Sequence, residues 1–223
     1  MATTVANMLT WAGYRLFPDG ETTITTSSEP SQAECLQWIN EVCNELLTVC
    51  ITTGSELGRS SVSITTVDGT STYTDLAALI FAPVLMYDRN GRQFSGYIEK
   101  TNVRNPLRLV GADALIDENP SEEGEPVEFY INGANGITFF PQPDDEYTAV
   151  IPYYPYHTVL TLTTNTIPFM QIFDNVILES VVMRAQNREE YDLAYELKWF
   201  SYIRSQAKKI IYLRKNPTTR IMF

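Results

Sequence analysis

Apolar residues near both ends of the chain recur at intervals of three and four positions, the spacing that predicts amphipathic helices. At the N-terminus the pattern follows Thr3 or Thr4, either of which can cap a helix, and Pro18 and Gly20 end it. The apolar face comprises Val5, Met8, Leu9, Ala12 and Leu16. We therefore expect a first helix between the threonines and Pro18.

A second helix is expected after a loop rich in Thr and Ser. Ser31 and Glu34 have the S-x-x-E spacing of a capping box, in which each side chain binds the backbone amide of the other residue. One face of this helix is apolar, and Gly54 ends it. The face comprises Leu36, Ile39, Cys43, Leu46, Leu47 and Cys50.

From Ser60 the apolar positions alternate with polar ones, which predicts strands. Asp68-Gly69 is expected to join the strands SVSITTV and STYTDL in a hairpin, and Asn90-Gly91 is expected to form a second hairpin. The acidic run DENPSEEGEP at 117–126 predicts an exposed loop, and LTLTT at 160–164 is a candidate last strand. Short strands separated by turns are typical of a small antiparallel sandwich or barrel.

Two helices are predicted to close the chain, at about 168–185 and 188–214. Pro168 is tolerated in a first helical turn, and Asn187 with Glu190 repeats the capping spacing. Asn216-Pro217 ends the second of these helices and leaves an extended tail, TTRIMF.

The predicted fold class is α+β. The N- and C-terminal helices form one helical bundle, into which an antiparallel domain resembling a β-sandwich or barrel is inserted. The expected boundaries are 1–58 and 164–215 for the helical domain, 59–163 for the β-domain and 216–223 for the extended C-terminal tail.

The net charge of −11 is unevenly distributed. From Lys198 to the end the chain has seven Lys or Arg and no Asp or Glu, so the remainder carries −18. An acidic body argues against non-specific wrapping of nucleic acid, because that binding depends on neutralising phosphates. The basic C-terminal segment is the one part of the chain whose charge suits an acidic partner, so we expect such a partner there. The sequence shows no signal-peptide pattern and no membrane-spanning run, so we expect synthesis in a reducing, intracellular compartment.

The candidate catalytic and metal-binding residues all have simpler interpretations. His157 has no Ser or Cys beside it in a nucleophile motif, which favours a surface or interfacial imidazole over a triad assembled in space. Cys35, Cys43 and Cys50 lie too far apart on one helix to bind one zinc ion by themselves, which favours buried thiols. The Asp144-Asp145-Glu146 carboxylates fit a solvated turn better than an acid–base pair or a calcium loop. We therefore expect no enzyme activity, no metal and no cofactor.

The segments ITFFPQP, YTAVIPYY and LTLTTNTIP follow one another and lead to EEYDLAYELKWFSYI. Upstream lie the helix ECLQWINEVCNEL and the strand STYTDL. Their order and spacing resemble the head-to-tail adaptor (connector) proteins of tailed bacteriophages, which carry an "I-x-L-x-P-x-P … Y-x-L-x-Y-Y" segment and an early "I-L-x-W-I-N-x-A" helix. STYTDL lacks the Pro of the family's "x-Y-x-L-P-x-D-L" strand, and residues 77–125 depart most from the family pattern.

The resemblance implies a structural role. Family members form a ring, commonly twelve-fold, beneath the portal protein of the DNA-filled capsid, and receive tail or nozzle proteins below. The C-terminal helix and tail reach the portal, so the implied portal-binding residues are Arg214, Lys215, Arg220, Ile221, Met222 and Phe223. DNA is expected to pass through the channel without specific binding. The protein is expected at the head–tail interface of the virion, assembled in the host cytoplasm without membrane contact.

Two other interpretations stay open from the sequence. The chain could be another virion part of similar architecture, such as a head-completion stopper or a tail-nozzle ring. It could also be a hydrolase whose site is assembled in space around His157 and the acidic turns.

Overall fold

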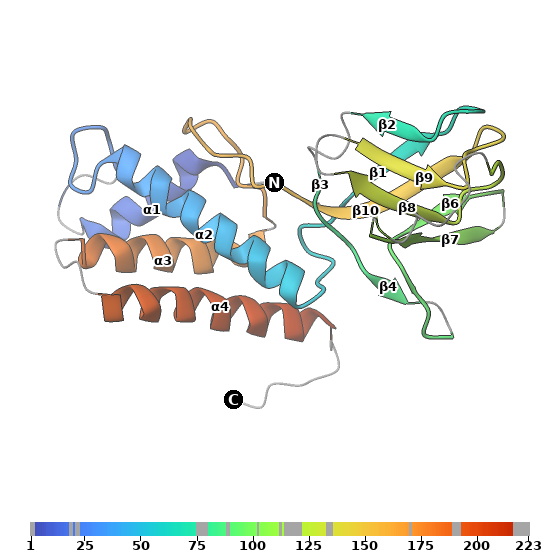
Figure 1. Cartoon of the computed structure of the whole chain (residues 1–223). Helices are drawn as coiled ribbons and strands as arrows, with labels where there is room; N and C mark the ends of the chain where they lie inside the picture. The colour runs from blue at the N-terminus through green and yellow to red at the C-terminus, as the bar shows by residue number, and fades with distance from the viewer. Residues whose placement is uncertain are drawn as a thin grey trace. The chain divides into compact units, whose positions relative to one another are not determined.

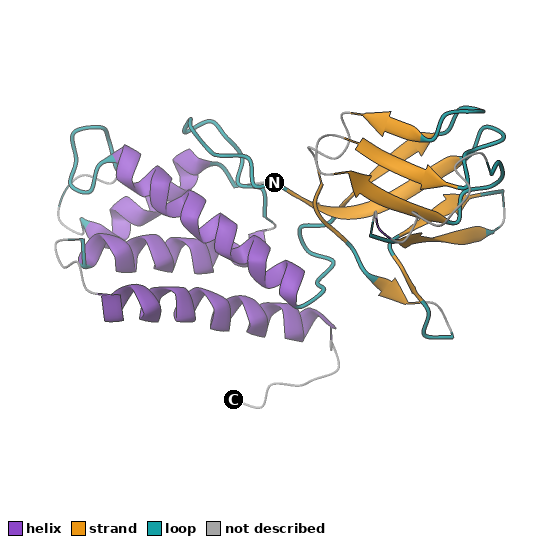
Figure 2. Ribbon diagram, in the orientation of Figure 1, coloured by secondary structure: helices purple, strands orange, loops and turns teal. Residues whose placement is uncertain are grey.

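The computed structural model describes residues 3–17, 20, 23–74, 80–87, 90–101, 103–111, 113, 122–132, 136–169, 171–188 and 193–215. The chain divides into two compact units, residues 1–58 with 157–223 and residues 59–156. The first unit contains the helices and the second contains the strands (Figures 1 and 2). The predicted α+β fold class is confirmed, because the N- and C-terminal helices pack together and the β unit is inserted in sequence between them.

The first two helices begin where their capping residues predict. The helices of this unit are α1 (Val5–Leu16), α2 (Gln32–Thr52), the 3-10 turn η3 (Gln171–Phe173), α3 (Asp174–Gln186) and α4 (Leu193–Lys215). Thr4 is the cap of α1, and its Oγ1 accepts a hydrogen bond from the Asn7 amide (3.3 Å). The complete capping box of Ser31 and Glu34 opens α2. The hydrogen bonds from Ser31 lower the pKa of Glu34, which keeps this carboxylate ionised at the helix N-terminus.

The central helix of this unit is α3. It packs against α1, α2 and α4, and it lies between α1 and α4 in Figure 1. Trp199 of α4 is fully buried, and its Nε1 donates a hydrogen bond to the carbonyl of Ser180 on α3 (2.8 Å). A buried indole N–H requires such an acceptor, so this bond fixes how α4 sits on α3.

The β unit is one curled sheet with a small hairpin beside it. Its strands are β1 (Ser60–Thr65), β2 (Thr72–Thr74), β3 (Ile80–Pro83), β4 (Met86–Tyr87), β5 (Gln93–Phe94), β6 (Gly96–Glu99), β7 (Arg104–Leu109), β8 (Glu128–Asn132), β9 (Gly136–Phe140) and β10 (Thr148–Pro155). The sheet has the order β1-β10-β6-β7-β8-β9-β2, and β3 also pairs with β10. All of its pairs are antiparallel except β7 with β8, which makes the sheet mixed.

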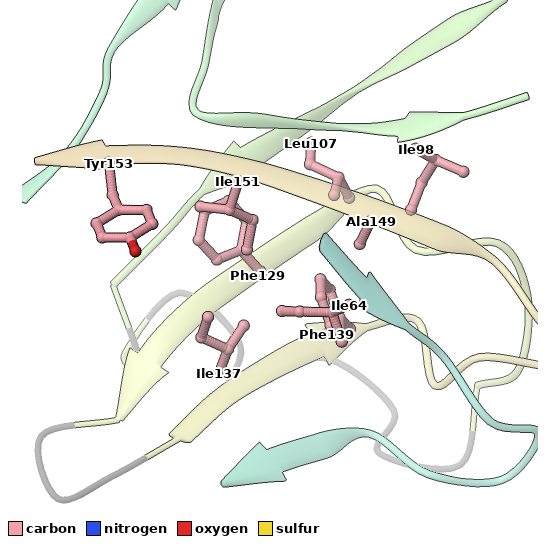
Figure 3. Close-up of a cluster of buried hydrophobic side chains, with 9 residues drawn as sticks. All are labelled: Ile64, Ile98, Leu107, Phe129, Ile137, Phe139, Ala149, Ile151 and Tyr153. Carbon is pink, nitrogen blue, oxygen red and sulfur yellow. The ribbon is translucent and has the colours of Figure 1, made fainter. Parts of the chain in front are cut away.

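The concave side of the curled sheet holds the core of the β unit. Figure 3 shows buried side chains from strands at both ends of the sheet order, and Ile64 of β1 and Phe139 of β9 belong to the same cluster. Phe129 and Phe139 are fully buried, and Tyr73 of β2 packs edge-on against Phe139 (5.6 Å between ring centroids). This shared core holds the two ends of the sheet close together.

One predicted hairpin is wrong and the other is confirmed. The turn at Asp68-Gly69 forms, with Gly69 at φ +73°, but β1 pairs with β10 and β2 pairs with β9. The turn therefore carries the chain from one end of the curled sheet to the other. Both partner strands contribute buried side chains to the core, whereas β2 is three residues long and buries none. At Asn90-Gly91 the expected hairpin is present, with Met86 opposite Phe94.

The candidate strand LTLTT is not a strand. The side chain of Asn40 on α2 forms hydrogen bonds with both backbone polar groups of Leu160. Its Oδ1 accepts from the amide (2.8 Å), and its Nδ2 donates to the carbonyl (3.0 Å). A residue whose amide and carbonyl are already bonded in this way has none left for a strand ladder.

The boundaries of the later helices also differ from the prediction. The helix expected from 168 begins at Asp174, after the 3-10 turn η3. Asn187 lies at the C-terminal cap of α3, where its Nδ2 donates to the carbonyl of Met183 (2.9 Å). Glu190, its expected capping partner, lies outside the described residues, as do residues 117–121 of the acidic loop.

Candidate interaction surfaces

The implied portal-binding residues lie at and beyond the end of α4. Arg214 is exposed in the last turn of the helix, and Lys215 is its final residue. The side chain of Lys215 and the whole of 216–223, with Arg220, Ile221, Met222 and Phe223, lie outside the described residues. Their role in portal binding stays a prediction.

The C-terminal half of α4 has two distinct faces. Ile203, Ala207 and Ile211 are buried against the rest of the helical unit. The opposite face is exposed and combines cations with large apolar side chains, namely Lys208, Lys209, Tyr212 and Leu213. Tyr212 is 58% exposed. A face that combines cations with exposed apolar groups is suited to a partner that offers carboxylates or aromatic rings together with apolar contacts.

The inner side of α4 is fixed to the other helices by ion pairs. Arg204 Nε donates to Oε1 of the buried Glu45 on α2 (2.5 Å), and this bond raises the pKa of Arg204. Arg184 of α3 pairs with Glu196 of α4, and its guanidinium lies 4.6 Å from the centroid of the Trp199 ring. These contacts fix the rotation of α4 and so determine which of its side chains face outward.

A second exposed surface of the helical unit lies on α1. Trp11 and Tyr14 are 39% and 60% exposed, one helical turn apart, while Val5, Met8 and Leu9 face the core. Exposed aromatic side chains are typical of binding surfaces, because Trp and Tyr combine a large apolar body with one polar group. The sequence pattern predicted the buried stripe of α1 but gave no reason to single out the aromatic residues opposite it.

Exposed carboxylates are concentrated around three connected turns of the β unit. They are Asp68, Glu122, Glu123, Asp144, Asp145 and Glu146. Backbone hydrogen bonds join the turns, from the Gly69 amide to the Pro143 carbonyl (2.9 Å) and from the Gly124 amide to the Gln142 carbonyl (2.9 Å). The hydroxyl of Tyr147 donates to Asp144, and this bond raises the pKa of Tyr147 to about 12. The described acidic turns are therefore solvated, as the sequence predicted.

A groove of about 720 Å³ lies on the β unit beside β5 and β7. Its lining residues include Phe94, Asn105, Pro106, Arg108 and Glu125. Lys100 Nζ and Asn105 Nδ2 each donate to Glu125 (both 2.6 Å). Burial raises the pKa of Glu125, but the hydrogen bonds from Lys100 and Asn105 together with the charge of Lys100 lower it by more. The net shift of the Glu125 pKa is therefore downward. No sequence pattern predicted the groove, because its residues come from separate strands and a loop.

His157 and the cysteines occupy structural positions. His157 is half-buried, its Nε2 lies 2.9 Å from Oδ1 of Asn40, and burial lowers its pKa. Cys35, Cys43 and Cys50 are buried thiols on α2, and burial raises their pKa values to about 12, 12 and 11. Within the described ranges, no three His, Cys, Asp or Glu side chains are grouped to hold a metal ion. The helices in those ranges include none that is long and apolar enough to cross a membrane.

The fold and these surfaces define a class of protein: a two-unit α+β protein whose prominent exposed features are candidate interaction surfaces. A family model described as SU10 adaptor protein matches residues 3–220, nearly the whole chain. The chain therefore belongs to this family of phage head–tail adaptor proteins, which is structural and is not known as an enzyme. The resemblance noted in the sequence is confirmed. No curated protein matches the chain.

Proposed function

We propose that this chain forms a ring that docks beneath the portal protein and connects the DNA-filled capsid to the tail. The observation that carries the proposal is the family match over residues 3–220, together with the basic and apolar end of α4. Membership in an adaptor family implies virion partners and a place at the head–tail interface. Ring formation and the contact with the portal protein go beyond the family match and are our proposal.

The portal contact is assigned to the end of α4 and the tail that follows. Lys209 and Arg214 are exposed there, and Arg220 follows the end of the helix in the sequence. These cations would pair with portal carboxylates, while Ile221, Met222 and Phe223 would fill an apolar groove of the portal.

The acidic composition supports a channel that DNA crosses without sticking. Residues 59–156 contain six basic and fourteen acidic residues, a net charge of −8. Exposed carboxylates repel the phosphate backbone, so a ring of such units would not hold DNA electrostatically. No membrane contact and no cofactor are part of the proposed function.

Deletion of residues 216–223 tests the portal contact. The described helices end at Lys215, so the truncated chain keeps every described helix and strand. We expect an unchanged circular dichroism spectrum and at least a tenfold loss of co-sedimentation with portal-bearing capsids. The matched control is Arg104→Ala, which also removes one cation but leaves the tail intact. Full attachment of the truncated chain would contradict the assignment.

The alternative virion roles, a head-completion stopper or a tail-nozzle ring, predict different neighbours. An adaptor gene should lie beside the portal and capsid genes, and the protein should form a stacked ring on purified portal in negative-stain images. The hydrolase alternative has little support, because the described partner of His157 is an amide that stabilises a loop. His157→Ala should therefore leave particle assembly and infectious yield intact.

A further inference from the structure

We propose that the outer face of α1 in one copy packs against the outer face of α4 in the next copy, and that this contact builds the ring. The inference rests on the ring-forming function proposed above, and it adds the two surfaces that make the contact. The partner is a second copy of this chain.

The α1 surface is bulky and aromatic. Asn7, Trp11 and Tyr14 lie on one stripe of the helix, because their spacing of four and three residues brings them to the same side. Trp11 and Tyr14 are exposed, and α1 contains no Asp or Glu. The aromatic rings are therefore the groups that this stripe offers to a neighbouring cation.

The α4 surface offers small side chains beside a cation, which complement exposed aromatic rings in size and in cation–π attraction. Its outer stripe has small side chains in the middle, an apolar residue toward each end and a cation, in the order Leu197, Ser201, Ser205, Lys208 and Tyr212. The small serines leave room for large side chains of a partner, and an ammonium group over a Trp or Tyr ring is attractive. Because the contacts between α4 and the other helices use the opposite side, with Trp199 and Ile203, the outer stripe remains exposed.

The placement of the two stripes favours a ring over a dimer. Within one copy α3 lies between α1 and α4, so the two stripes belong to different sides of the helical unit (Figure 1). A contact between two different surfaces is heterologous, so each added copy presents a new free surface until the ring closes. A symmetric contact of α4 with α4 would instead bring together two surfaces that both carry exposed cations, and would stop at two copies.

Site-specific cross-linking tests the contact. Tyr14→Cys and Ser201→Cys are combined in one chain, the chain is assembled into phage particles, and a short bismaleimide is added. The native thiols are buried with pKa values near 11 to 12, so they react slowly. We expect a ladder of covalent multimers. Each single variant should stay monomeric, and a mixture of the two single variants should give dimers.

A control pair of cysteines should not cross-link, and a second pair tests the same contact at neighbouring positions. Asn44 is exposed on α2, so Asn44→Cys with Ser201→Cys should give monomers. Trp11→Cys with Ser205→Cys repeats the test on neighbouring positions of the same stripes.

The outcomes separate the contact from the proposed function. A ladder from either α1–α4 pair supports the contact. Particles that contain the chain but yield no ladder with either pair overturn the contact alone, as do dimers from a single variant. Particles that lack even the unmodified chain overturn the ring-forming function and the contact with it.

Discussion

Two ion pairs, one in each unit of this protein, are built differently. In the helical unit, the Arg184 side chain is 17% exposed, and it joins α3 to Glu41 on α2 and Glu196 on α4. In the β unit, Arg104 is 66% exposed and pairs with Glu99 on the adjacent strand. Strand pairing already positions the second pair, whereas the rotation of a helix about its axis is not set by its own backbone hydrogen bonds. The comparison teaches that the Arg184 pairs help to specify how the helices pack, whereas the Arg104 pair adds little to a strand pairing that backbone hydrogen bonds already fix.

The largest expected effect comes from Trp199, which joins the apolar core of the helical unit to its polar network. Trp199→Ala removes a fully buried side chain, its bond to Ser180 and the ring beside Arg184. We expect a loss of about 3–5 kcal/mol in the free energy of unfolding, measured by urea denaturation. Trp11→Ala on the exposed stripe of α1 is the matched control, with an expected loss of about 1 kcal/mol or less. Equal losses would show that Trp199 does not hold the helices together.

The comparison itself is tested by removing one arginine from each unit. Arg184→Met leaves the carboxylates of Glu41 and Glu196 without their partly buried cation. We expect a loss of about 2 kcal/mol, below the range for a fully buried pair because both carboxylates retain some contact with water. Arg104→Met removes an exposed pair and should cost about 0–1 kcal/mol. Similar losses at the two sites would break the proposed distinction.

What the sequence predicted well was decided by neighbouring residues. The capping box of Ser31 and Glu34, the cap at Thr4 and the Asn90-Gly91 hairpin each depend on side chains a few positions apart, and all three are present. The partner of a strand is not a local property. The turn at Asp68-Gly69 was recognised, but nothing near it indicates that β1 and β2 pair with strands that follow much later in the sequence.

The interaction surfaces show the same limit. The buried stripes of α1 and α4 follow from apolar spacing, but the outward orientation of Trp11, Tyr14 and Lys208 follows from contacts among several helices. LTLTT has the alternating pattern of a strand, yet Asn40, far away in sequence, binds the backbone of Leu160. No spacing rule connects these two residues.

Asn40 offers a smaller test of how polar contacts specify the helical unit. Asn40→Ala removes both partners of the Leu160 backbone and the hydrogen-bond partner of His157. We expect a loss of about 1–2 kcal/mol, because partly buried backbone groups are left without partners. Asn44→Ala changes an exposed residue one turn later on the same helix, and should fall within about 0.5 kcal/mol of the unmodified protein. A loss of stability in Asn40→Ala but not in Asn44→Ala would identify the hydrogen bonds to the Leu160 backbone, rather than helix propensity, as the cause.

The smallest expected effect lies in the acidic turns of the β unit, where polar contacts are solvated. The bond from the Tyr147 hydroxyl to Asp144 raises the pKa of Tyr147 from its usual value near 10 to about 12. A raised pKa means that the folded state favours the protonated phenol. The stabilisation is therefore fully present below about pH 10 and is lost as the pH rises through 12. Asp144→Asn removes the charge while keeping an acceptor, so the Tyr147 pKa should move back toward 10. NMR titration of the Tyr147 ring, assigned with Tyr147→Phe, measures this shift. Because Asp144 is exposed and asparagine still offers an acceptor, solvent screening makes the loss of stability at neutral pH small. A large loss there would show that polar contacts specify the packing of the β unit as well.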